Sequence, residues 1–239
     1  MTGIAWHGSP NFGPRRSGAV PDLIVLHYTA MTSAEAALQR MCDPGIEVSA
    51  HYLLGRDGRC WQLVDEEMRA WHAGAGSWGG RGDVNSHSIG IELDNDGASP
   101  FPAPLMDRLE TLLADILARH AIPPARVIGH SDMAPDRKID PGRRFDWTRL
   151  ARRGLACWPD AGADDAAGAA PKASTQLEAG FRDAATQIGY PGDTDITPLL
   201  DAFRARFWQQ ARGPLTPADI ARAEQVARLC PVDPGASAA

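Results

Sequence analysis

Several features are missing from this 239-residue sequence, and each absence excludes a class of protein. No run approaches the roughly 18 apolar residues that a membrane-spanning helix needs, so we expect no membrane span. The formal net charge is -6, whereas a nucleic-acid partner favours a basic face, so we expect no such partner. No protein partner is evident either.

The first 18 residues also lack the order of a signal peptide, in which a basic stretch precedes an apolar one. We therefore expect a cytoplasmic protein if Met1 is the native start. If a leader has been removed, the alternative is the periplasm or cell envelope.

Closely paired cysteines are absent as well. The four cysteines lie far apart, with no C-x-x-C pair, at positions 42, 60, 157 and 230. Four cysteines allow three pairings, and their spacing does not choose among them. We favour free thiols in a reducing compartment over disulfides.

The first part of the chain alternates strand and helix patterns. Residues 22–30 form a short apolar run rich in β-branched side chains, which is typical of a buried strand. Residues 49–64 predict two strands joined at a turn, RDG, and residues 88–95 predict another strand. Residues 32–42 and 104–120 have helical spacing. The predicted fold is α/β, with a mixed central sheet flanked by helices.

The composition changes after Trp158. Residues 159–174 are rich in alanine, glycine, aspartate and proline without periodicity, which predicts a linker. Three segments of helical spacing follow and predict a small all-α domain at 175–232, with a tail at 233–239. Residues 1–158 would then form the catalytic domain. In the helical part, Tyr190 and Trp208 either stack on sugars or pack in the core.

Two histidines stand at the C-terminal ends of predicted strands, where open sheets tend to bind ligands. They are His27 and His130, and Asp140 follows the second by ten positions. A catalytic zinc site commonly uses three such nitrogen or oxygen ligands plus a water. These residues are candidate metal ligands, although a histidine at a strand end can also be an ordinary hydrogen-bonded residue. We assign Asp132 and Asp136, in the same loop, to turn and solvent roles.

Glu92 lies in the middle of a predicted strand, on the face opposite Ile89 and Ile91. An ionised carboxylate there is costly unless it has a partner or a task. A metal-activated water needs a base to take its proton, and glutamate is a common choice. The alternative is a cross-sheet salt bridge with an arginine. Lys138 either stabilises a developing oxyanion or is simply solvated.

Five segments carry a resemblance to a known family: VLHYTA, SAHYLL, AWHAG, SIGIEL and GHSDMAPDRKIDPG, in this order. Together they resemble the zinc-dependent N-acetylmuramoyl-L-alanine amidases of the type-2 amidase family. The likeness is to the bacterial branch that acts on peptidoglycan fragments and anhydro-muropeptides, and it covers residues 20–158. The helical tail resembles the peptidoglycan-binding module of envelope-type members, through its helix order and LLDAFRARF.

The resemblance implies one zinc ion per chain, held by His27, His130 and Asp140. It assigns Glu92 as the general base and Lys138 as the oxyanion stabiliser. The residues that it implies for the substrate site, each with a structural alternative, are Tyr28, His51, Trp71, His72 and Asn85. The implied reaction is hydrolysis of the amide bond between N-acetylmuramic acid, or its anhydro form, and L-alanine of the stem peptide.

A second class of function is a module that recognises peptidoglycan without cutting it. Loss of a zinc ligand would mark such a protein, and all three ligands are present, which favours the enzyme. Among enzymes, the missing signal peptide favours a cytosolic recycling amidase for soluble fragments, whereas the helical tail favours an envelope amidase for the polymer.

Overall fold

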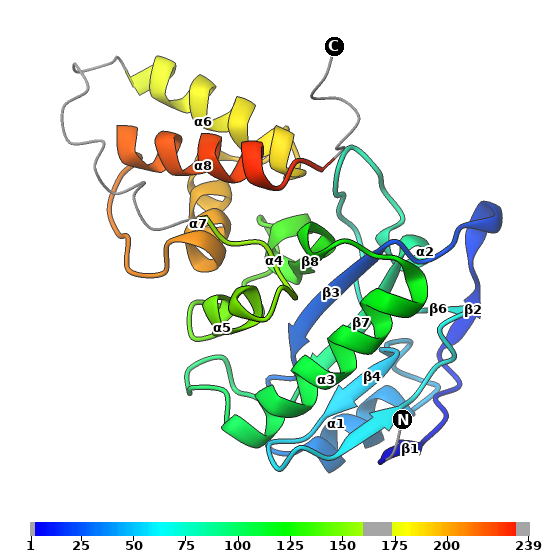
Figure 1. Cartoon of the computed structure of the whole chain (residues 1–239). Helices are drawn as coiled ribbons and strands as arrows, with labels where there is room; N and C mark the ends of the chain where they lie inside the picture. Colours follow the sequence, from blue (N-terminus) through cyan, green and yellow to red (C-terminus); the bar gives the residue numbers. More distant parts are fainter. Residues whose placement is uncertain (1–2, 160–173, 233–239) are drawn as a thin grey trace.

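The computed structural model describes residues 3–159 and 174–232 (Figure 1). The expected linker, apart from its two end residues, and the expected tail lie outside the described residues. Six strands form the central sheet, in the order β1-β5-β4-β7-β3-β8. Their bounds are β1 Ile4–Trp6, β3 Leu23–Tyr28, β4 Tyr52–Leu54, β5 Cys60–Gln62, β7 Ser88–Leu93 and β8 Val127–Gly129.

The sheet is mixed, as predicted. Strand β3 pairs in parallel with β7 and β8, and β7 pairs in parallel with β4. Strands β4 and β5 are antiparallel and form the expected hairpin. Gly58 in its turn has a φ of 85°, a conformation that glycine adopts without steric cost. A separate two-stranded ribbon joins β2 (Phe12–Pro14) and β6 (Met68–Ala70), which the sequence did not predict.

Helix α3 (Ala103–His120) lies across one face of the sheet (Figure 1). Its apolar stripe packs on the side chains of β3 and β7 that point toward it, including Ile24, Leu26, Ile89 and Ile91. On the other face, α1 (Ala34–Met41) packs on Leu53, and the Ser33 side chain caps its first turn. In the described ranges, no helix is both long enough and apolar enough to cross a bilayer.

The face of the sheet away from α3 carries the polar residues of β7. Strand register places His27 of β3 beside Glu92 of β7. Side chains alternate along a strand, so these two residues share a face with Ser88 and Gly90. The expected alternation along β7 is confirmed, because Ile89, Ile91 and Leu93 all join the α3 core. The site therefore lies on the face that α3 leaves free, at the C-terminal ends of β3, β7 and β8.

Helices α6, α7 and α8 follow in the C-terminal part, with α6 and α8 side by side (Figure 1). The remaining helices in the described ranges are α5 (Trp147–Arg152) and four that each span about one turn, two of which (η1 and η2) are 3-10 helices. The other bounds are η1 Arg16–Gly18, α2 Val84–His87, η2 Pro124–Arg126, α4 His130–Met133, α6 Ser174–Ile188, α7 Ile196–Phe207 and α8 Pro217–Leu229. The expectation of helices in this part is confirmed.

These C-terminal helices share one continuous apolar core with the sheet. Phe181, Phe203 and Phe207 belong to the same buried cluster as Val25 and Ile128 of β3 and β8. A boundary between two domains at residues 158–175 stays a prediction, but the packing across it is continuous.

The two aromatic side chains considered for sugar stacking differ in their exposure to solvent. Tyr190 is only 2% exposed, so the sugar-stacking alternative for this residue is wrong. Trp208 is half-buried, and the Arg222 guanidinium lies 5.3 Å from the centre of its ring.

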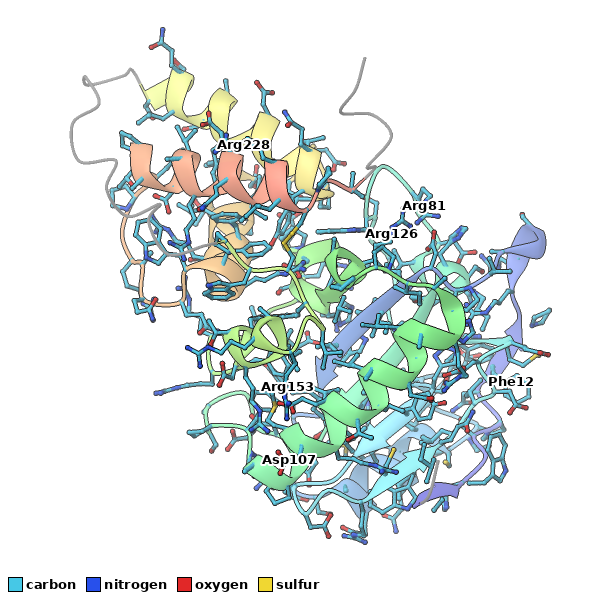
Figure 2. All side chains as sticks on the ribbon, viewed as in Figure 1. Phe12, Arg81, Asp107, Arg126, Arg153 and Arg228 are labelled. Carbon is cyan, nitrogen blue, oxygen red and sulfur yellow. A yellow bond between two sulfur atoms is a disulfide. The ribbon has the colours of Figure 1, made fainter. Side chains whose placement is uncertain are left out.

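The expectation of four free thiols is wrong for two of the cysteines. Cys157, after α5, forms a disulfide with Cys230, at the end of α8, and Figure 2 draws it as a yellow bond. Cys42 and Cys60 are free. Spacing could not reveal the pair because 73 positions separate its members, and only the packing of the helices against the sheet brings them together.

We predict that replacing both Cys157 and Cys230 with serine destabilises the protein by about 4 kcal/mol, since a disulfide that closes a long loop restricts the unfolded chain. Urea unfolding with and without dithiothreitol measures the loss. Cys42→Ser is the control, because its thiol is free. Thiol titration of the denatured, unreduced protein should find two reactive groups, and four would contradict the disulfide.

Candidate active site

Three ligand-type atoms converge at the C-terminal ends of β3 and β8. The Nδ1 atoms of His27 and His130 lie 3.0 Å apart, and Oδ2 of Asp140 is 3.1 Å from each of them. All three residues are at most 9% exposed. In the described part of the chain, this is the one group of histidines, cysteines or acids arranged to hold a metal ion.

In each imidazole ring, a hydrogen bond at Nε2 determines whether Nδ1, which faces the other two ligand-type atoms, carries a proton. The Ser88 hydroxyl donates to the carbonyl of Val84, at 2.6 Å, so its oxygen accepts from Nε2 of His72, at 3.2 Å. Nδ1 of His72 is then without a proton and accepts from Nε2 of His27, at 3.1 Å. The Nδ1 of a neutral His27 therefore carries a lone pair toward the metal-type site.

In His130, a single hydrogen bond leaves Nδ1 without a proton. Its Nε2 lies 2.9 Å from the carbonyl of Ala73 and must donate to it, which leaves Nδ1 unprotonated on a singly protonated ring. Three lone-pair atoms thus face one another with no proton between them. Such an arrangement is repulsive unless a cation lies among them.

The electrostatics of the site maintain these protonation states. Burial, together with the neighbouring His130, lowers the pKa of His27 to about 4. Burial and the neighbouring His27 hold the pKa of His72 well below its usual range. Burial alone would raise the pKa of Asp140, but the neighbouring His130 and His27, whose Nδ1 atoms lie 3.1 Å from its carboxylate, hold it well below its usual value. The group is therefore ready to bind a metal at neutral pH, because metal ligands must be deprotonated.

A cavity of about 570 Å³ opens over these ligand atoms, and both predicted catalytic residues line it. Burial raises the pKa of Glu92 to about 8, with a further contribution from the negative charge of Asp140, while Lys138 opposes the rise. Oε2 of Glu92 is buried without a hydrogen-bond partner among the described residues, so no arginine neutralises that oxygen. A carboxyl group held in this way can exchange a proton near neutral pH.

Four of the five residues expected at the substrate site line this cavity: Tyr28, Trp71, His72 and Asn85. Asn85 also has a structural task, because its Oδ1 accepts the backbone N–H groups of His72 and Ala73. Contact of the four residues with a substrate stays a prediction. His72 in addition fixes the protonation of His27, a role that the sequence did not predict.

His51 does not reach the cavity, and its expected contact with substrate is wrong. The ring is fully buried behind His72, and backbone groups satisfy both of its nitrogens. Nδ1 accepts from the N–H of Gly90, and Nε2 donates to the carbonyl of Met68, each at 3.0 Å. The structural alternative, a hydrogen-bonded core histidine, is the one observed.

Two residues that support the histidines were not identified from the sequence. Gly90 leaves room for His72, since a Cβ at this position would lie 2.4 Å from the imidazole ring. The guanidinium of Arg15 fills the space behind His51, where it donates to the carbonyls of Glu66, Ser86 and Ser88. A lone glycine in a strand suggests such a close approach without naming what approaches.

Asp132 also corrects an expectation. It is 1% exposed rather than solvated, and its carboxylate accepts hydrogen bonds from Gly129, Tyr190 and Arg206. The last two of these donors belong to the C-terminal part of the chain. Asp136 is exposed, as expected.

A mixed α/β sheet that holds two imidazoles, a carboxylate and a separate, partly buried glutamate at its strand ends defines a candidate metal-dependent hydrolase. Comparison with known proteins agrees. The sequence profile described as N-acetylmuramoyl-L-alanine amidase matches residues 17–143. The chain therefore belongs to this family, and it is an amidase.

Individual relatives resemble the chain over different lengths. N-acetylmuramoyl-L-alanine amidase AmiD of Escherichia coli is 38% identical over 208 residues, which cover 77% of this chain and 74% of that protein. 1,6-Anhydro-N-acetylmuramyl-L-alanine amidase AmpD of Haemophilus influenzae is 36% identical over 159 residues, or 59% of this chain and 86% of that protein. The motif-based assignment to the family is confirmed.

A solved structure resembles the chain over most of its length. It is the complex of E. coli AmiD with anhydro-N-acetylmuramic acid-L-Ala-D-gamma-Glu-L-Lys, with a TM-score of 0.78 and 34% identity. The match covers 89% of this chain and 91% of that one. The likeness of the C-terminal helices to a peptidoglycan-binding module stays a prediction.

We predict that Ser88→Ala weakens divalent-metal binding about 10-fold, the lower end of the range for lost support behind a ligand, because His72 loses the acceptor that fixes its proton. Competition with a chromogenic chelator measures the affinity. Ser86→Ala is the matched control, since its buried hydroxyl bonds Asp83 and Arg16 outside this chain of hydrogen bonds. Equal losses in the two variants would contradict the prediction.

Proposed function

We propose that this chain is a zinc-dependent amidase that cleaves the bond between N-acetylmuramic acid, or its anhydro form, and L-alanine of the stem peptide. The observation that carries the proposal is the convergence of Nδ1 of His27, Nδ1 of His130 and Oδ2 of Asp140 under a cavity that also contains Glu92. Support for the substrate comes from the relatives, whose names specify muramyl-L-alanine or its 1,6-anhydro form.

The donor set fits zinc better than the common hard cations. Two imidazole nitrogens and one carboxylate oxygen are ligands that Zn²⁺ binds well, and three protein ligands are typical of a catalytic site. Calcium and magnesium prefer oxygen ligands throughout. When bound, zinc would polarise the scissile carbonyl and increase the acidity of the attacking water.

The remaining chemistry falls to residues of this chain. Glu92 takes a proton from the attacking water and returns it to the leaving nitrogen of L-alanine, which suits a carboxyl group whose pKa is raised by burial. Lys138 lines the same cavity, and its ammonium group stabilises the negative charge that develops on the carbonyl oxygen. Tyr28 and Trp71 offer ring surfaces for the substrate along the wall.

The alternative, a module that recognises peptidoglycan without cutting it, has less support. Such a module has no use for a glutamate with a buried, unpartnered oxygen beside the ligand group, which costs folding free energy. The complete ligand group and Glu92 together favour hydrolysis.

We also propose that the protein acts in an oxidising compartment, such as the bacterial envelope, rather than in the cytoplasm. The Cys157–Cys230 disulfide supports this location, because structural disulfides persist in oxidising compartments and are rare in the cytosol. This location is tested by the thiol titration described above, carried out on protein whose free thiols are alkylated as the cells are opened.

An assay with two substrates tests the proposed function. We expect release of the stem peptide from a soluble anhydro-muropeptide and from intact sacculi, loss of both activities on chelation, and recovery on adding one equivalent of Zn²⁺. The ratio of the two rates distinguishes a recycling enzyme from one that acts on the polymer. Release of peptide that persists after the metal has been fully removed would contradict the zinc requirement.

We predict that Glu92→Gln lowers kcat by at least about 100-fold, the usual contribution of a general base, while one zinc ion stays bound. The amide keeps the size of the side chain and removes its ability to accept the proton. Kinetics and metal analysis of the same preparation separate the two outcomes. Loss of zinc together with activity would make Glu92 a ligand rather than a base.

A further inference from the structure

Helix α4 carries the ligand His130, yet it is only four residues long and cannot fix its own position. Its backbone connects two ligands, because the N–H of Ser131 donates to the carbonyl of Asp140 at 2.9 Å. A shift of α4 would therefore move both His130 and Asp140. The residues that fix the position of α4 therefore also determine the geometry of the candidate metal site.

Several of the contacts that hold α4 come from the C-terminal part of the chain, in addition to the hydrogen bond that the N–H of Ser77 donates to the carbonyl of Met133 at 2.9 Å. Arg206 of α7 donates from Nη1 to Oδ2 of Asp132, at 3.0 Å, and from Nη2 to the carbonyl of Val127 in β8, at 2.8 Å. The hydroxyl of Tyr190, just after α6, donates to Oδ1 of Asp132 at 2.6 Å. Oδ2 of Asp132 also accepts the N–H of Gly129 at 2.7 Å, which closes the first turn before His130. Figure 1 shows α7 beside α4.

The burial of this cluster gives it a definite geometry. Asp132, Arg206 and Tyr190 are each at most 2% exposed, and the Arg206 guanidinium lies 5.0 Å from the Trp147 ring and 4.7 Å from that of Phe207. Breaking a buried ion pair leaves an uncompensated charge, so the arrangement has few alternatives. The Cys157–Cys230 disulfide further ties the end of α8 to the chain that follows α5.

We propose that Arg206 and Tyr190 are positioning residues for the metal ligand His130, so that the C-terminal helices are a structural part of the active site. The proposal rests on the proposed zinc function. It differs from the expected role of a peptidoglycan-binding module, because it requires no contact between these helices and glycan. The residues matched by the family profile end at 143, before α6. The support that Arg206 and Tyr190 give to α4 therefore comes from outside the part of the chain that the profile covers.

Arg206→Gln tests the proposal with a control inside the same helix. Arg204 is equally buried, at 2% exposure, and pairs with Asp219 of α8 through two 2.7 Å hydrogen bonds. That ion pair lies wholly within the C-terminal helices and does not contact α4. Arg204→Gln should therefore cost comparable stability without moving a ligand. Tyr190→Phe removes only one hydroxyl and is the second test variant if Arg206→Gln does not fold.

We predict that Arg206→Gln weakens zinc binding about 10-fold or more, as loss of support behind a ligand typically does. At saturating zinc we expect kcat to fall while KM changes little, because the cavity wall is unaltered. Tyr190→Phe should show a smaller loss of the same kind. Chelator competition gives the affinity, and thermal unfolding shows whether the two arginine variants are comparably destabilised.

The result that overturns the proposal is equal zinc affinity in Arg206→Gln, Tyr190→Phe and the wild-type protein, or an equal loss in Arg206→Gln and Arg204→Gln. Failure of the proposed function has a different signature, because the wild-type protein itself would then bind no zinc or release no peptide. The wild-type measurement is made first and separates the two cases.

Discussion

The active site depends on the direction of one hydrogen bond. The Ser88 hydroxyl has a single proton and gives it to the carbonyl of Val84. That choice makes the serine oxygen an acceptor for His72, makes His72 an acceptor for His27, and leaves the inner nitrogen of His27 free of a proton. Reversing any bond in this series would place a proton on the nitrogen that is proposed to bind the metal. Burial enforces the order, because Ser88, His72 and His27 are each at most 8% exposed and have few alternative partners.

Sequence periodicity predicted the elements that carry this series but not the series itself. His27, Glu92 and His130 could be placed at their positions because strand ends and alternation depend on residues nearby in the chain. The contacts of His72 with Ser88, of Asp132 with Arg206, and of Cys157 with Cys230 join residues 16, 74 and 73 positions apart. Only the packed fold determines such pairs. Local patterns therefore gave Asp132 turn and solvent roles, of which the solvent role is wrong. The family resemblance offered His51 to the substrate with a core histidine as the alternative, and the structure shows the alternative.

The buried polar groups around the site differ in what they contribute. Asp132 and Arg206 form a buried ion pair, which makes a single arrangement of α4 and α7 favourable. Glu92, by contrast, keeps an oxygen without a hydrogen-bond partner in the described part of the chain. A folded protein that retains such a group gives up stability at that position, and catalytic groups are where this cost commonly appears. The continuous core that joins the sheet to the C-terminal helices supplies apolar burial that offsets it.

The two histidines proposed as metal ligands are supported from different parts of the molecule. His27 is oriented by His72 and Ser88, which belong to the sheet and the loop that precedes it. His130 donates to Ala73 in that same loop, but the helix that carries it is held by α7 and by Tyr190. A relative of this chain without the C-terminal helices would need another means of fixing its second histidine. The support that Arg206 and Tyr190 give to α4 is therefore a property of this longer architecture, in which helices outside the residues matched by the family profile complete a site within them.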